Sequence, residues 1–85
     1  MSDEVRVYPN PSFGELNVRF TAGDNENFSF KVIDVLGKTL AQSNYNSFKG
    51  ENIQQLDLNK LPSGIYFLSI EKQGNKIHTK RFVIE

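Results

Sequence analysis

Apolar and polar residues alternate along most of the chain, with the period of a β-strand that buries one face. The clearest stretch is Leu16–Phe20, where Asn17 and Arg19 separate the apolar positions. The periodic stretches are rich in β-branched and aromatic residues, and helical spacing of apolar residues is absent. The pattern predicts about seven strands, over residues 5–7, 16–20, 28–32, 38–44, 53–58, 65–71 and 77–84.

Turn-forming residues separate these strands. Asp34 and Gly37 occupy the first and fourth positions of a segment typical of a type I turn, and Gly37 can take the left-handed conformation of a bulge. Leu61–Gly64 has Pro second and Gly fourth, which again favours type I. Short strands and close turns predict an all-β fold, an antiparallel immunoglobulin-like β-sandwich, with a small barrel as the alternative.

The inward positions of the alternation define the predicted core. Tyr66 follows a tight turn at the start of a strand, where sandwiches place a corner tyrosine that bonds to upstream backbone. Leu58 and Leu61 are expected beneath this corner. In Tyr8–Pro11 two prolines remove two N–H donors, so the first strand stops or bends there. The predicted core consists of Leu16, Val18, Phe20, Phe28, Phe30, Val32, Leu40, Leu56, Leu58, Tyr66, Leu68 and Ile70.

Composition narrows the classes of function. The 85 residues allow one domain, and ten basic and ten acidic residues cancel, so no nucleic-acid partner is predicted. The absence of cysteine excludes disulfides, thiolate zinc sites and thiol catalysis. His78, the only imidazole, lies in an alternating strand and is interpreted as an exposed strand residue. Without a nucleophile–base pair the sequence predicts no enzyme, no catalytic residue and no cofactor.

Two binding hypotheses remain from the residues alone. Asp24–Asn27 offers oxygen atoms that could bind Ca²⁺, although the segment lacks EF-hand spacing and a solvated hairpin loop is the favoured interpretation. Tyr45, Phe48 and Phe67 could contact carbohydrate if they are exposed, whereas burial of these aromatics within the sandwich would remove that function.

Four blocks of the sequence resemble the C-terminal sorting domains of the type IX (Por) secretion system. Each block alone is weak, but they occur in the family's order from Val5 to Ile84. The family's patterns are Pro-Asn-Pro followed by Gly, an acidic or amide residue before Gly-Lys, Leu-x-x-Leu-x-x-Gly-x-Tyr, and a basic-then-apolar last strand. The matching residues are Pro9, Asn10, Pro11, Gly14; Asp34, Gly37, Lys38; Leu58, Leu61, Gly64, Tyr66; and Lys80, Arg81, Phe82, Val83.

The resemblance implies a non-enzymatic export signal at the C-terminus of a larger protein of Bacteroidetes. In that family a sandwich folded in the periplasm directs its N-terminal cargo through the outer-membrane translocon. A sortase-like cysteine protease then usually removes the domain, and the cargo reaches the outer-membrane surface or the extracellular space. Many members end in a basic residue, whereas this chain ends in Glu85.

The resulting expectations are specific. Residues 1–4 are interpreted as a flexible or artificial start without a signal peptide, and residues 5–85 as the sorting domain, a fragment of a larger secreted protein. The alternative function is an immunoglobulin-like binding or spacer module of a cell-surface protein that contacts carbohydrate. An exposed edge strand would also allow self-association.

Overall fold

The computed structural model describes residues 5–9, 11, 13–73 and 75–85. These residues form seven β-strands and no helix, which confirms the all-β prediction. Each predicted strand is present, with ends that differ by a few residues. The strands are β1 (Val5–Tyr8), β2 (Glu15–Ala22), β3 (Asn27–Ile33), β4 (Thr39–Asn46), β5 (Gly50–Asp57), β6 (Gly64–Lys72) and β7 (Asn75–Ile84).

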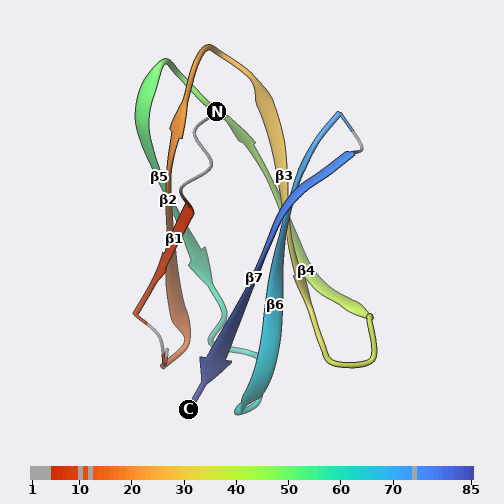
Figure 1. Cartoon of the computed structure of the whole chain (residues 1–85). Coiled ribbons are helices and arrows are strands. Elements are labelled where there is room, and N and C mark those ends of the chain that lie inside the picture. Colours follow the sequence, from red (N-terminus) through yellow and green to blue (C-terminus); the bar gives the residue numbers. More distant parts are fainter. Residues whose placement is uncertain (1–4, 10, 12, 74) are drawn as a thin grey trace.

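The strands build two antiparallel sheets that pack face to face (Figure 1). One sheet has the order β1-β2-β5 and the other the order β4-β3-β6-β7. The two sheets remain separate, so the fold is a sandwich and not the alternative barrel. The chain runs up and down in alternation, so the β1–β2, β3–β4 and β5–β6 connections and the C-terminus lie at one end, the lower end in Figure 1. We call this the motif end.

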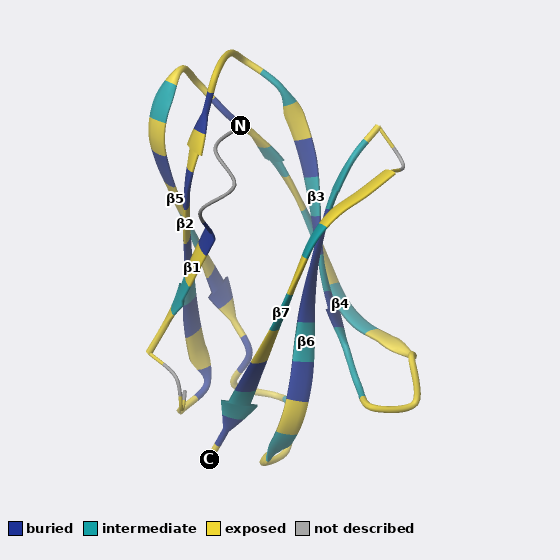
Figure 2. Ribbon diagram, in the orientation of Figure 1, coloured by how far each residue is buried: buried dark blue, intermediate teal, exposed yellow. Residues whose placement is uncertain are grey.

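The core lies between the sheets, and the buried positions alternate along the strands that face it (Figure 2). Eleven of the twelve predicted core residues are buried. Phe20 joins Phe28 and Phe30 through edge-to-face contacts with ring centroids 5.3 and 5.9 Å apart. Aromatic pairs of this geometry stabilise a core beyond their buried area. The core also contains four hydrophobic residues that were not predicted, Val5, Ala22, Phe82 and Ile84.

Leu40 is the exception among the predicted core residues, because it is only half-buried against the core. The register of β3 and β4 pairs Val32 with Ala41 but Ile33 with Thr39, so Leu40 is an extra residue at a β-bulge. A bulge reverses the side to which alternate residues point. As a result Ala41 and Tyr45 pack toward the core beyond the bulge. The even-numbered residues that follow Leu40 in β4 do not.

Candidate functional site

The first motif block surrounds the connection from β1 to β2. Pro9 and Pro11 are exposed, and Asn10 lies outside the described residues. Gly14 is buried at a φ of 112°, in the left-handed region that favours glycine. A Cβ there would lie 2.3 Å from the side-chain oxygen of Asn59, and the carbonyl of Gly14 accepts a 2.7 Å hydrogen bond from the Leu58 amide. The glycine is therefore needed for close contact between two turns.

The second block forms the turn between β3 and β4. The Asp34 carboxylate accepts hydrogen bonds of 2.9 Å from the amides of Leu36 and Lys38. The Gly37 amide donates to the Asp34 carbonyl at 3.0 Å, and Gly37 has a φ of 86°. These contacts confirm the predicted turn and its left-handed glycine. Lys38 itself is exposed.

The third block is the predicted tyrosine corner. The Tyr66 hydroxyl donates a 2.5 Å hydrogen bond to the carbonyl of Pro62, four residues upstream. Leu58 is buried beneath the corner and Leu61 packs partly against the core, as predicted. The φ of Gly64 lies outside the left-handed region, so the backbone conformation there does not require glycine. A Cβ at Gly64 would meet only the Tyr66 ring, at an ordinary contact distance of 3.7 Å.

The fourth block is the end of β7. Phe82 is fully buried and stacks on Tyr66, with ring centroids 5.9 Å apart and planes at 28°. Lys80 and Val83 are half-buried, whereas Arg81 is exposed and pairs in register with Phe67 of β6. Phe82 therefore anchors the strand, and the basic residues before it remain accessible.

All four blocks lie at or near the motif end, although they are distant in the sequence (Figure 1). The first and third blocks touch through Gly14 and Leu58, and the third and fourth through Tyr66 and Phe82. The second block occupies the same end without a described contact to the others. Most of the motif residues support turns or the core. Among the motif residues that the structure describes, the exposed ones are Pro9, Pro11, Gly37, Lys38 and Arg81.

The three aromatics considered for carbohydrate binding do not form a common platform. Tyr45 packs toward the core, stacked on Phe30 with centroids 5.9 Å apart. Phe67 is half-buried on β6, and Phe48 is 56% exposed in the connection from β4 to β5. Because these rings belong to different faces, they cannot stack against one sugar.

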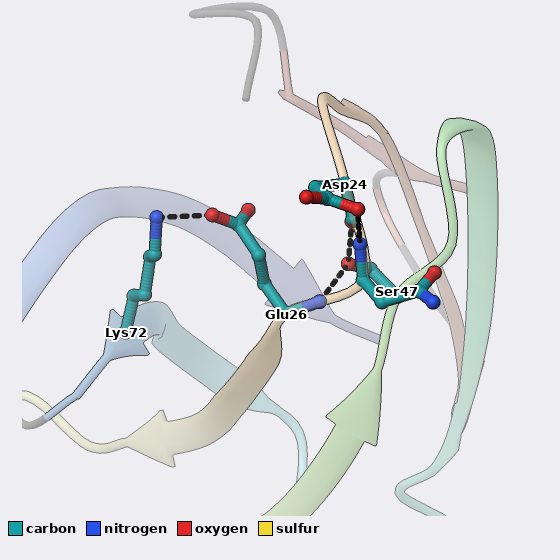
Figure 3. Close-up of polar contacts among 5 residues, drawn as sticks. Asp24, Glu26, Ser47 and Lys72 are labelled. Carbon is teal, nitrogen blue, oxygen red and sulfur yellow. Dashed lines mark hydrogen bonds and ion pairs between the residues drawn. The ribbon is translucent and has the colours of Figure 1, made fainter.

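The Asp24–Asn27 loop is held by contacts within the chain (Figure 3). The Ser47 hydroxyl donates to the Asp24 carbonyl at 2.9 Å and accepts from the Glu26 amide at 3.0 Å. The Glu26 carboxylate forms an ion pair with Lys72. Among the described residues, no three Asp, Glu, His or Cys side chains are grouped to hold a metal ion. His78 was expected to be exposed, but it is half-buried on β7, opposite Ile70.

Sequence reasoning missed a buried polar centre at Asn52. This side chain is fully buried and donates to the carbonyls of Phe48 and Gly50 at 2.9 and 3.0 Å. Its oxygen accepts from the Tyr45 hydroxyl at 2.9 Å and the Phe48 amide at 3.1 Å. The alternation that places Leu56 and Leu58 inward also places Asn52 inward, so the signal was present in the sequence.

A family model for secretion system C-terminal sorting domains, those of the type IX (Por) system, matches residues 6–85. The chain belongs to this family. Sorting domains of the family are in general not catalytic, and the family implies export to the cell surface or the extracellular space. A search of curated proteins gave no match.

Among solved structures, the domain is similar to an immunoglobulin-like protein from Pseudomonas aeruginosa. The TM-score is 0.56, and the alignment covers 96% of this chain and 90% of that chain. The two sequences are 8% identical, so the similarity shows the fold alone. The predicted immunoglobulin-like sandwich is confirmed. The described residues contain no helix that is long and apolar enough to cross a membrane.

Proposed function

We propose that the domain is a non-enzymatic signal that directs a cargo protein, linked to its N-terminus, through the outer-membrane type IX translocon. Proteolytic removal by a sortase-like cysteine protease and attachment of the cargo to the cell surface follow translocation. On this proposal residues 5–85 form the sorting unit of a larger secreted protein, and the domain passes through the periplasm in transit.

The observation that carries the proposal is the family match over residues 6–85 together with the convergence of the motif blocks. Gly14, Asp34 and Tyr66 each fix a turn at the motif end through the contacts described above. A rigid end held in this way presents a constant shape to a receptor, at a low entropic cost of binding. A signal that is recognised by a translocon needs such a constant shape and no catalytic group.

Export of a reporter tests the proposal. The chain is fused to the C-terminus of a periplasmic reporter in a bacterium with a working type IX system. We expect the reporter in the medium or on the cell surface, and in the periplasm of a strain whose translocon is disabled. If the reporter stays in the periplasm of both strains, the export hypothesis is wrong and the binding or spacer module is the better hypothesis.

Truncation of the last strand is a poor control for this assay. Deleting residues 80–85 removes the buried side chains of Phe82 and Ile84, and loss of two core residues is expected to unfold so small a domain. Retention of the truncated fusion would then report unfolding and not recognition. Substitution of the accessible residues of β7 is more informative, because it leaves the core intact.

A further inference from the structure

A surface groove of about 670 Å³ lies on the side of the sandwich where β1 and β7 border the two sheets. Its lining comes from β1, β2 and β7, and Val5 and Val7 place apolar surface within it. Val5 is buried and Val7 packs partly against the core, so the groove reaches down to the hydrophobic interior. We call this feature the β1–β7 groove.

The described charged residues that line the β1–β7 groove are all basic, although the whole chain has no net charge. Its lining includes four cations and no acidic side chain among the described residues: Arg6, Arg19, Lys80 and Arg81. Arg19 forms an ion pair with Glu51 and Arg6 is also engaged in an interaction, so Lys80 and Arg81 are the cations on which the argument depends. Among the described residues, no carboxylate lies within ion-pair distance of Lys80 or Arg81. Grouped cations of this kind attract and orient an acidic partner.

The backbone of β7 offers a second means of recognition. β7 is the edge strand of its sheet, and no described strand pairs with the outer edge of residues 75–82. The free amides and carbonyls of an edge strand form hydrogen bonds with an added extended segment. Lys80 and Arg81 are neighbours in the strand and point to opposite faces of the sheet. Acidic residues at alternate positions of an added segment all point to one face, so they meet Lys80 or Arg81 according to the face they occupy.

We propose that the β1–β7 groove binds an extended, acidic segment of a partner protein, which adds as a strand to the edge of β7. The proposal rests on the export function and names the chemistry of the partner that reads the signal. Lys80 and Arg81 supply charge, the edge of β7 supplies backbone hydrogen bonds, and the half-buried Val7 contacts apolar groups. An anionic glycan would use only the first of these features, which is why a peptide fits the groove better.

A labelled peptide tests the proposal directly. The probe is a fluorescein-tagged peptide of alternating Glu and Thr, as long as β7, and binding to the purified chain is measured by fluorescence anisotropy at low salt. We expect binding that weakens as salt rises. The double variant K80E/R81E is expected to bind at least about tenfold more weakly, since the glutamates of the peptide meet a negative charge in place of a cation on whichever face they occupy.

The matched control is K49E/K60E, which changes the net charge equally at two exposed lysines outside the groove. Its affinity should stay within about twofold of the unmodified chain. Melts followed by circular dichroism establish that each variant is folded. If K80E/R81E does not fold, the single substitution R81E, at an exposed position, replaces it with a smaller expected loss of binding.

Two further probes distinguish strand addition from binding by charge alone, and a protein partner from an anionic glycan. A peptide of alternating Glu and Pro has the same charge but lacks half of the amide donors, and we expect it to bind more weakly than the Glu–Thr peptide. Equal binding of the two peptides would overturn strand addition. Tighter binding of polygalacturonate than of the Glu–Thr peptide would overturn a protein partner in favour of an anionic glycan.

No binding of the Glu–Thr peptide, or equal binding by K80E/R81E and the unmodified chain, would overturn the groove as the site. These outcomes are independent of the reporter assay, because the purified chain is used without the secretion system. A domain that exports its cargo but does not bind the acidic peptide therefore retains its proposed function and loses this inference.

Discussion

The two open sides of the sandwich are built in opposite ways. On the β4–β5 side, the Tyr45 hydroxyl of one sheet bonds to Asn52 of the other at 2.9 Å, inside a neutral buried network. Two cavities there have volumes of about 170 and 390 Å³, and both include the acidic Asp57 in their lining. The larger one also includes Lys60. On the β1–β7 side the groove is about 670 Å³ and its charged lining residues are basic.

If the β1–β7 groove is the recognition site that we propose, stability and recognition are assigned to different sides of one small fold. On the β4–β5 side, the hydrogen bond from Tyr45 to Asn52 joins the two sheets, and loss of either partner would leave a polar group without its hydrogen bond at a high desolvation cost. The β1–β7 side keeps accessible cations that contribute little to stability. Of the four motif blocks, only the last contributes cations to this groove, through Lys80 and Arg81.

Phe30→Ala is expected to cause the largest effect, a loss of about 3–5 kcal/mol in the free energy of unfolding. Phe30 is almost fully buried, packs on Phe20 and Tyr45 and lines the small β4–β5 cavity. Thermal melts followed by circular dichroism measure the loss. Phe48→Ala, at an exposed position, is the control and should change stability by less than about 0.5 kcal/mol. Equal midpoints for the Phe30 variant and the unmodified domain would remove Phe30 from the core.

Asn52→Ala is expected to cost about 2–4 kcal/mol, because it leaves the Tyr45 hydroxyl and the backbone groups of Phe48 and Gly50 without their partner. Urea titration measures the change. Asn44→Ala, an exposed asparagine on β4, should be nearly neutral. If both variants match the unmodified domain, the buried network does not hold the two sheets together, and the comparison between the two sides fails.

Tyr66→Phe is expected to lower stability by about 0.5–1.5 kcal/mol, the usual net contribution of one hydrogen bond. The substitution keeps the ring that stacks on Phe82 and removes only the bond to Pro62. Tyr8→Phe, at an exposed tyrosine, serves as the reference in the same urea titration. If Tyr66→Phe and Tyr8→Phe have the same free energy of unfolding, the corner hydrogen bond does not contribute to stability.

The strands and the corner could be predicted from the sequence because they depend on local signals. Alternation placed most of the core, and Asp34, Gly37 and Tyr66 have turn preferences that neighbouring residues specify. Leu40 was wrong because a one-residue bulge after the turn changed the phase of β4.

The β1–β7 groove could not have been predicted in the same way. Its cations come from three strands, and the neutral net charge of the chain hides their grouping. Arg6 and Arg19 are brought opposite each other by strand register, which alternation alone does not determine. Lys80 and Arg81 were identified through family resemblance, but their place beside β1 depends on how the two sheets pack.

The most direct test of the division between the two sides is the export of matched reporter fusions. Fractionated cells carrying the unmodified domain, K80E/R81E or K49E/K60E are compared, after melts have shown that each domain is folded; R81E replaces K80E/R81E if that variant does not fold. The account predicts that K80E/R81E is retained in the periplasm, while K49E/K60E, with the same change in net charge, is exported like the unmodified domain. Normal export of a folded K80E/R81E fusion, or equal retention of both variants, would contradict it.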